Sequence, residues 1–94
     1  NVAISLGADG LALGSIEGIV LAKPPPVQAR TVVGVGDVLL AGLIWAWGQG
    51  ATTAEVAAWG VAAGTASAMG EGVSVAALDE VRAVYERVHT AWLA

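Results

Sequence analysis

Hydrophobic residues in the first part of the chain come in short runs separated by turn residues. Residues 2–6 are a β-prone run that stops at Gly7-Ala8-Asp9-Gly10, and Asp-Gly ahead of a second apolar run at 11–13 favours a hairpin. Residues 15–18 form another turn signal before a third apolar run at 19–22. The pattern predicts a small antiparallel meander of three strands.

From Asp37 onward the apolar positions follow a helical pattern instead. Residues 38–47 are apolar on every side, which predicts a helix of about three turns that is buried from all directions and ended by a glycine-rich turn. Thr52 and Glu55 have the spacing of a capping box. A second helix is therefore expected from about residue 53 to 69.

A third helix is expected near the end of the sequence, with Ser74 as its cap. Its apolar positions recur at spacings of three and four and would face a core: Leu78, Val81, Tyr85, Val88 and Trp92. His89 would lie on the exposed flank of this helix without metal partners, and we interpret it as structural or solvated. Strands followed by three helices are typical of the closing part of an α/β domain, which is the fold class predicted here.

The two halves meet at Gly34-Val35-Gly36-Asp37, which follows a stiff bridge, Lys23-Pro24-Pro25-Pro26, and an extended stretch at 27–33. Glycines allow positive φ and close approach of a ligand, and the first turn of a helix leaves N–H groups that suit a phosphate. Beside such an anion hole, Asp37 makes chemical sense as a base that takes a proton from an attacking hydroxyl. Aspartate is also a good helix N-cap, so the sequence leaves both interpretations open.

The apolar content is high for so small a chain. The 94 residues allow one domain at most, yet 56% of them are hydrophobic, with a mean hydropathy of +0.73. Because a chain of this size buries only about 60–65% of its unfolded surface, the excess indicates a membrane protein, a partner or a piece of something larger. No run of about 20 apolar residues is present to span a membrane. Gly60 and Gly64 have the small-xxx-small spacing, which we interpret as close helix packing inside a soluble fold.

Charge and residue chemistry exclude several classes of function. A net charge of −4 with four basic residues gives no patch that could neutralise a nucleic-acid backbone. The sequence has no Cys, Cys/His cluster, Ser-His-Asp set or GxxxxGK[ST] motif, so disulfide-scaffold, metalloenzyme, hydrolase and P-loop interpretations lose their support. Cations for a phosphorylated substrate would have to come from outside this sequence. The chain begins at Asn1 without a targeting signal, and we expect it to be the interior start of a longer protein.

Three linked motifs resemble the C-terminal third of ribokinase-like sugar kinases. They are Ser-Leu-Gly-Ala-Asp-Gly at 5–10, Ala-Lys-Pro-Pro-Pro-Val at 22–27, and the turn at 34–37 with Ala41-Gly42 one turn on. The likeness covers nearly all 94 residues in order and spacing. Within these kinases, the sequence is most similar to the phosphofructokinase B group, which contains 1-phosphofructokinase and tagatose-6-phosphate kinase.

The resemblance implies a cytoplasmic, ATP-dependent kinase that acts on a hydroxyl of a sugar phosphate, of the fructose 1-phosphate type or a related ketose phosphate. Mg²⁺ would accompany ATP through phosphate oxygens and water, with no protein metal ligand. Asp37 would be the catalytic base, and Gly34, Val35 and Gly36 the anion hole around the γ-phosphoryl group. The implied nucleotide-binding residues, of which Ala63 and Gly64 would lie near the adenine, are Ser5, Leu6, Gly7, Ala8, Asp9, Gly10, Gly36, Asp37, Ala63 and Gly64.

The resemblance further implies that residues 1–94 are the nucleotide-binding portion of one kinase domain, with the sugar-binding portion and lid upstream. The isolated chain is therefore expected to be inactive. The family turn usually reads Gly-Ala-Gly-Asp after a Thr or Ser two places earlier, whereas Val35 and Val32 stand here and either could lower activity. A non-catalytic nucleotide-binding relative, an oligomerising structural module and a homodimer of the full-length parent all stay open.

Overall fold

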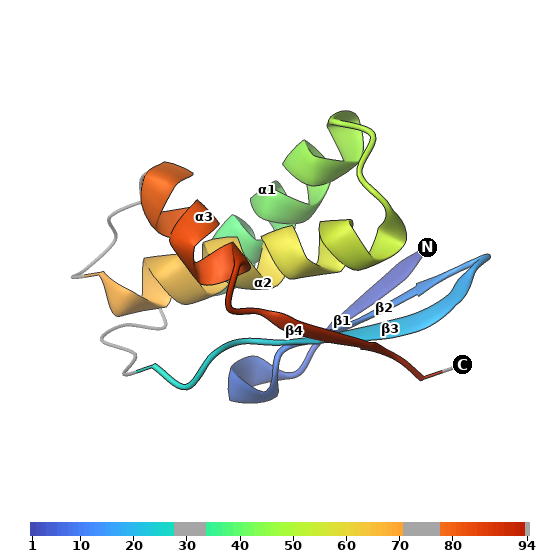
Figure 1. Cartoon of the computed structure of the whole chain (residues 1–94), viewed down its shortest axis with the longest axis horizontal. Coiled ribbons are helices and arrows are strands. Elements are labelled where there is room, and N and C mark those ends of the chain that lie inside the picture. The colour runs from blue at the N-terminus through green and yellow to red at the C-terminus, as the bar shows by residue number, and fades with distance from the viewer. Residues whose placement is uncertain (28–33, 71–77, 94) are drawn as a thin grey trace.

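In the part of the chain that the structure describes, four strands form one antiparallel sheet, and three α-helices lie on one of its faces (Figure 1). The computed structural model describes residues 1–27, 34–70 and 78–93. The strands, adjacent in this order, are β1 (Val2–Ser5), β2 (Leu11–Ser15), β3 (Gly18–Lys23) and β4 (His89–Trp92). The helices are α1 (Val35–Gly48), α2 (Thr53–Met69) and α3 (Leu78–Tyr85), and a short 3-10 helix η1 (Gly7–Asp9) lies between β1 and β2.

The predicted meander is confirmed, and its first connection contains a short 3-10 helix. Residues 7–9 form η1, and the Leu6 amide donates to the Gly10 carbonyl at 2.8 Å. Gly10 has a φ of 105°, and a Cβ built on it would lie 1.9 Å from the carbonyl oxygen of Ala22. The chain can therefore enter β2 at this point only with a residue that has no side chain.

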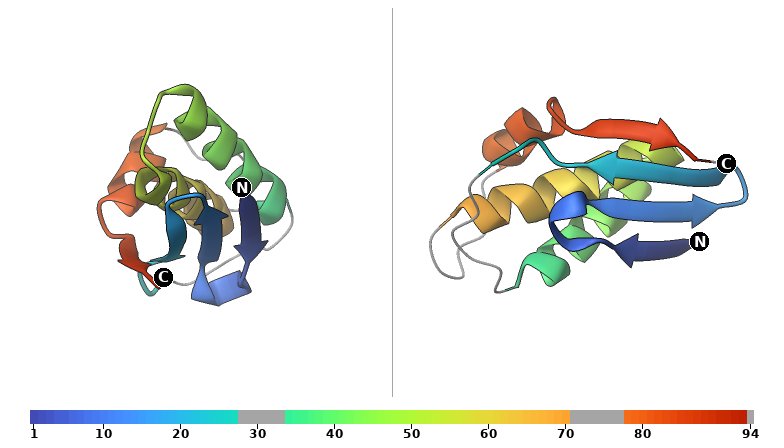
Figure 2. Two further views of the ribbon diagram at one scale, coloured as in Figure 1. Left: turned by 90° about the vertical axis from the view of Figure 1, so that its right-hand side faces the viewer. Right: turned by 90° about the horizontal axis from the view of Figure 1, so that it is seen from below.

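Helix α2 lies at the centre of the molecule, between α1 and the sheet (Figures 1 and 2). Its capping box is confirmed: the Glu55 amide donates to Thr52 Oγ1 at 3.3 Å, and the Thr52 amide donates to Glu55 Oε1 at 2.9 Å. Accepting this hydrogen bond lowers the pKa of the Glu55 carboxyl. Nearly the whole length of α2 is buried. Its side chains are mostly small, so neighbouring elements can pack closely around it.

Glycines allow α1 and α2 to approach closely. A Cβ on Gly42 would lie 2.9 Å from Ala63 Cβ and 3.1 Å from the Trp59 carbonyl oxygen. A Cβ on Gly60 would lie 2.5 Å from Leu43 Cδ2. The interpretation of the small-xxx-small spacing as helix packing is thus confirmed, and no described helix has the length and apolar character needed to cross a bilayer.

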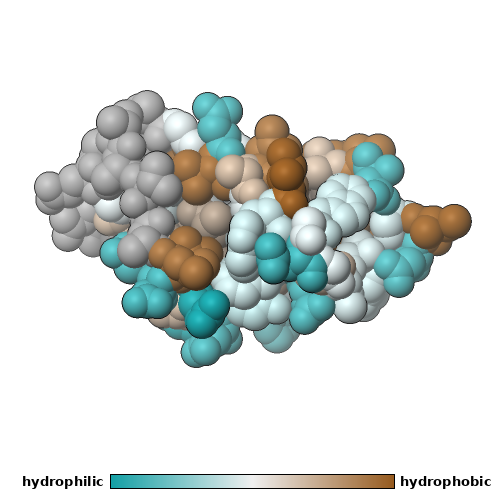
Figure 3. Space-filling view, turned by 90° about the horizontal axis from the view of Figure 1, so that it is seen from above, coloured by the Kyte–Doolittle hydropathy of each residue, from teal (hydrophilic) through white to brown (hydrophobic). Residues whose placement is uncertain are grey.

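The structure corrects the expectation that residues 38–47 are buried on every side. Within α1 only Leu43 and Ala46 are buried, while Leu40, Ile44 and Trp47 are more than half exposed. Helix α1 is in the outer layer and packs against α2 along a single face. The space-filling view of the helical side accordingly shows hydrophobic patches among the hydrophilic ones (Figure 3).

The expected third helix is also shorter than its apolar spacing suggested. Helix α3 ends at Tyr85, and residues 89–92 pair with β3 as the antiparallel strand β4. His89 is therefore an exposed strand residue opposite Lys23 instead of a helix residue. The proposed cap Ser74 lies outside the described residues.

A row of aromatic side chains links the three helices. The rings of Trp45 and Trp59 meet edge to face at 5.2 Å between centroids, and Trp59 stacks on Tyr85 at 4.0 Å with 16° between the planes. Desolvation, with the charge of Glu55 as a second cause, raises the pKa of the Tyr85 hydroxyl. These aromatic contacts pack α3 against α2, next to a small apolar cluster that contains Ala62 and Ala66.

Candidate functional site

One end of the sheet and the first turn of α1 enclose a cavity of about 650 Å³. Four parts of the chain contribute: the η1 region, the proline bridge, α1 and α2. The described lining residues are Ser5, Gly7, Asp9, Gly10, Lys23, Pro24, Pro25, Pro26, Val27, Val35, Gly36, Leu39, Val61, Gly64, Thr65 and Ala68.

The N-terminus of α1 presents amide groups at this cavity. Gly34 is the N-cap residue with a φ of 75°, and the first intrahelical hydrogen bond runs from the Val38 amide to the Gly34 carbonyl at 3.1 Å. The amides of the first turn therefore have no carbonyl acceptor within the helix, and no side-chain cap is formed at this end. Cβ atoms built on Gly34 and Gly36 would meet nothing within 4 Å among the described residues. The described residues therefore leave room for an anion to approach these N–H groups, with the helix dipole in its favour.

Asp37 is in the first turn of α1 and is exposed. Because Gly34 occupies the cap position and no side chain caps this end, the interpretation of Asp37 as an N-cap is wrong. Its carboxylate follows directly on Gly36, which lines the cavity. The residue is therefore exposed beside the amides at the start of α1.

The remaining walls combine an apolar interior with a polar rim. Pro25 is buried, and Leu39, Val61 and Ala68 supply hydrocarbon surface, while Gly64 contributes no side chain. Exposed side chains of Lys23 and Asp9 also line the cavity. An apolar slot of this kind with polar groups at one end suits a flat ring joined to an anionic group.

Most of the sequence-predicted residues come together here. The cavity is lined by Val35 and Gly36 from the predicted anion hole, and by Ser5, Gly7, Asp9, Gly10 and Gly64 from the implied nucleotide-binding set. Leu6, Gly34 and Asp37 are neighbours of lining residues in the chain without lining the cavity themselves. The side chain of Ala8 lies outside the described part of the structure. Ala63 faces Gly42 in the contact between α1 and α2, so its assignment near an adenine stays a prediction.

Several lining residues were not predicted from the sequence. Val61, Thr65 and Ala68 lie three before, one after and four after Gly64, so they share its face of α2. The helical spacing around Gly64 would have identified them. The proline bridge and Lys23 were interpreted as a connection only, although the bridge forms one wall.

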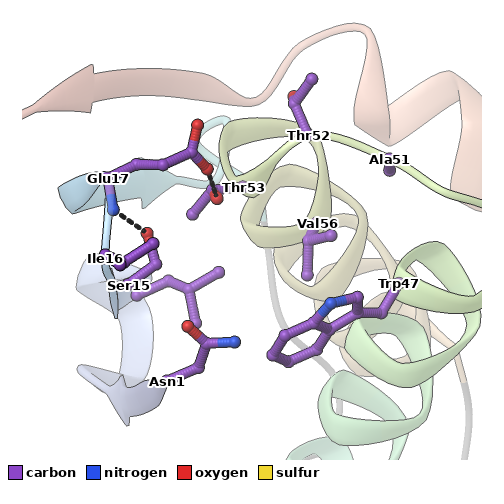
Figure 4. A pocket seen from close by; sticks show the side chains of 10 residues that line it. Asn1, Ser15, Ile16, Glu17, Trp47, Ala51, Thr52, Thr53 and Val56 are labelled. Carbon is purple, nitrogen blue, oxygen red and sulfur yellow. Dashed lines mark hydrogen bonds between the residues drawn. The ribbon is translucent and has the colours of Figure 1, made fainter.

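A second cavity, of about 240 Å³, lies at the opposite end of the sheet (Figure 4). There the Glu17 amide donates to Ser15 Oγ at 3.1 Å, and Thr53 Oγ1 donates to the Glu17 carboxylate. These hydrogen bonds tie the β2–β3 turn to the start of α2. The indole of Trp47 forms the facing wall, and none of the predicted site residues lies here.

Carboxylate, thiol and imidazole groups do not gather into a metal-binding cluster in the described ranges 1–27, 34–70 and 78–93. The chemistry available at the larger cavity therefore comes from amide donors, the Lys23 and Asp9 side chains, the neighbouring carboxylate of Asp37 and an apolar slot.

Comparison with known proteins finds similarity to carbohydrate kinases. The model of the pfkB family carbohydrate kinases matches residues 1–80. A 1-phosphofructokinase of Vibrio cholerae is 44% identical over 45 residues, which are 48% of this chain and 14% of that protein.

Solved structures are similar over nearly the whole chain. A structure assigned as a phosphofructokinase from Staphylococcus aureus has a TM-score of 0.91 and 29% identity over 98% of this chain and 29% of its own. Phosphofructokinase-2 from Escherichia coli in complex with substrates and products has a TM-score of 0.86 and 29% identity over 92% and 28%. The tetrameric inhibited form of the E. coli protein has a TM-score of 0.82 and 28% identity over 92% and 27%. The chain thus spans under a third of the length of these relatives.

Proposed function

Because the chain belongs to the pfkB family of carbohydrate kinases, we propose that it is the nucleotide-binding and phosphoryl-transferring portion of an ATP-dependent sugar-phosphate kinase. Its acceptor would be a hydroxyl of a ketose phosphate of the fructose 1-phosphate type. The sugar-binding portion and the lid would belong to the part of a family-length chain outside these 94 residues. On this proposal the 94-residue chain alone does not turn over substrate, and the complete kinase acts in the cytoplasm as a monomer or homodimer.

The observation that supports this proposal best is the first turn of α1 at the edge of the cavity, where the amides have no acceptor within the helix. In phosphoryl transfer the equatorial oxygens of the transferring group carry negative charge, and preorganised amide donors stabilise that charge. Val35 and Gly36 are the first residues of α1 and line the cavity, so the helix that follows fixes the direction of their amides. The apolar slot between the proline bridge and α2 would take the nucleotide's ring system.

Asp37 would accept the proton of the attacking sugar hydroxyl. The residue is exposed beside the anion-binding end, where an acceptor bound by the rest of the kinase could reach it. When bound with ATP, Mg²⁺ would neutralise phosphate charge through phosphate oxygens and water. That arrangement is compatible with this cavity, where Asp9 is the one carboxylate among the described lining residues.

The test uses the protein encoded by the complete gene, called the gene product below. Asp37→Asn should lower kcat by about 10²–10⁴-fold with a much smaller change in ATP affinity, because the substitution removes the proton acceptor and keeps the amides. Steady-state kinetics with fructose 1-phosphate and ATP measure the rate, and calorimetry with a non-hydrolysable ATP analogue measures binding. Asp79→Asn, an equivalent change at an exposed site on α3, should leave both unchanged. An Asp37→Asn enzyme with the wild-type rate would refute the base assignment.

A non-catalytic relative is the second candidate, and Val35 is the observation that favours it. A Cβ built on Gly64 would lie 3.5 Å from Val35 Cγ1, so the valine packs towards α2 beside the anion-binding amides. A gene product that binds ATP and phosphorylates no ketose phosphate, before and after Val35→Ala, would support this candidate over the kinase.

A further inference from the structure

The smaller cavity, at the end of the sheet opposite the start of α1, has the features of a separate binding site. The two cavities share none of their described lining residues, so the proposed kinase reaction makes no use of the smaller one. Its volume of about 240 Å³ is below the ~300–1,000 Å³ of sites that hold drug-sized molecules, which suits a smaller ligand. We call it the Trp47 cavity.

One side of the Trp47 cavity is hydrocarbon. Leu13 and Val56 line it and are only 4% and 3% exposed, because both belong to the main core cluster. The indole of Trp47 is 51% exposed and forms the wall that faces the β2–β3 turn (Figure 4). A ligand whose apolar part lies against these three side chains removes their exposed surface from water, which favours binding.

The other side of the Trp47 cavity carries a carboxylate that is already held in place. The Glu17 amide donates to Ser15 Oγ at 3.1 Å, and the Thr53 hydroxyl donates to the Glu17 carboxylate (Figure 4). A carboxylate accepts several hydrogen bonds through its two oxygens, so the bond from Thr53 leaves acceptor capacity for a ligand. Because Glu17 is held before binding, a ligand that donates to it costs little additional side-chain entropy.

The charges at this end favour a cation. The start of a helix ordinarily attracts anions, and the Trp47 cavity lies at the start of α2. At this helix end, however, Glu55 accepts the Thr52 amide and Glu17 accepts the Thr53 hydroxyl, so a further anion would meet two carboxylates. The described lining residues include no Lys, Arg or His, and the chain as a whole has a net charge of −4.

We propose that the Trp47 cavity binds a small primary amine with an apolar body. Its ammonium group donates to Glu17, and its apolar body lies against Trp47, Leu13 and Val56. An ammonium group fits the polar side because it has three donors and no acceptor, and its charge complements the carboxylate. The amine binds at the end of the sheet away from the larger cavity, so it does not displace a nucleotide.

The first test compares three probes of similar shape on the gene product by isothermal titration calorimetry. 2-Phenylethylamine, a cation at neutral pH, should bind with a Kd of about 1 mM or lower. Neutral 2-phenylethanol and anionic 3-phenylpropionate should bind at least about tenfold more weakly, because they lack the charge that pairs with Glu17. The proposal is overturned if the amine and 3-phenylpropionate bind equally, or if the amine does not bind at about 10 mM.

Variants then locate the amine. Glu17→Gln removes the charge and keeps a hydrogen-bonding side chain, and Trp47→Leu removes the aromatic wall, so each should raise the Kd of 2-phenylethylamine at least about tenfold. Glu86→Gln and Trp92→Leu are the matched controls at exposed positions outside the cavity and should change the Kd by less than about twofold. Thermal unfolding confirms that each variant is folded. Wild-type affinity in Glu17→Gln would overturn the proposal.

Two further measurements separate this inference from its alternatives. The Kd of 2-phenylethylamine should be the same with and without a saturating non-hydrolysable ATP analogue, and competition between them would place the amine in the larger cavity and overturn the proposal. Tighter binding of Nα-acetyl-lysine amide than of 2-phenylethylamine would assign the Trp47 cavity to a lysine of a partner protein, which also overturns it. A gene product that binds the amine and no ATP would contradict the proposed function and leave this inference standing.

Discussion

Gly42 controls how closely α1 approaches α2. A Cβ at this position would lie 3.1 Å from the Trp59 carbonyl oxygen and 3.2 Å from Gly60 Cα, and backbone atoms cannot move aside as a flexible side chain can. We expect Gly42→Ala to lower the free energy of unfolding by about 1–3 kcal/mol through overpacking. Urea unfolding followed by circular dichroism measures the change.

Gly48 is the matched control for this prediction. It belongs to the same helix, and a Cβ built on it would meet nothing within 4 Å among the described residues. Gly48→Ala should be neutral or add about 0.5 kcal/mol, because alanine loses less conformational entropy in a helix. If both variants lost the same stability, the close contact at Gly42 would not be the cause.

Gly10 is a residue for which a structural role and a predicted binding role coincide. A Cβ on Gly10 would overlap the Ala22 carbonyl oxygen at 1.9 Å, whereas one on Gly7 would meet nothing within 4 Å. Both residues have positive φ, so alanine is strained at either position. We expect Gly7→Ala to cost about 1–2 kcal/mol in unfolding free energy and Gly10→Ala clearly more, as thermal unfolding without nucleotide would show. Equal losses would contradict the steric argument.

Residue chemistry alone could not decide between the two interpretations of Asp37. Both glycine and aspartate are good N-cap residues, and a sequence does not reveal which of several consecutive residues takes the non-helical φ. The structure assigns that role to Gly34, with its φ of 75°, and leaves Asp37 inside the first turn. The catalytic role of Asp37 remains a prediction.

Among the elements, α2 has the clearest pH-dependent contribution to stability. The ionised Glu55 side chain accepts the Thr52 amide at the helix start, which lowers its pKa from the ordinary value of 4.5. A carboxyl whose pKa is lower in the folded state stabilises the fold above its unfolded pKa, and that contribution is lost as the pH falls through the folded pKa. The wild-type chain should therefore lose stability below about pH 4.5.

Substitution at Glu55 tests that assignment. Glu55→Gln should reduce the loss of Tm between pH 6 and pH 3, since the neutral amide does not titrate, and thermal unfolding at a series of pH values measures it. Glu80→Gln, at an exposed position in the first turn of α3, is the comparison with an ordinary surface carboxylate. An unchanged pH profile in Glu55→Gln would exclude the capping box as the source.

Element boundaries were predictable where local chemistry decides them and not where pairing across the sheet decides them. The capping box placed the start of α2 correctly, because its two hydrogen bonds are local. Val88 and Trp92 continue the three-and-four spacing of α3, yet residues 89–92 pair with β3. A free strand edge with matching backbone groups outweighed a helical pattern that local sequence alone favoured.

For the whole molecule, the sequence was sufficient for the α/β fold class, the meander and the central helix, and its motifs identified the family. The family resemblance grouped Ser5, Gly7, Asp9, Gly10, Val35, Gly36 and Gly64 as residues of one binding site, and all seven line one cavity. The exposed side of α1 was not predictable from its composition. A helix that is apolar on every side is buried only if the rest of the fold surrounds it, and in the described part of the chain a single helix contacts it closely.

The late position of β4 in the chain has a consequence for biosynthesis. Its partner β3 leaves the ribosome well before it, and all three α-helices are translated between the two strands. Until β4 arrives, the β3 edge has unpaired backbone groups flanked by Val20, Leu21 and Ala22, and such edges recruit other chains. Nascent chains stalled before residue 89 should therefore aggregate or bind chaperones more than chains released after residue 93.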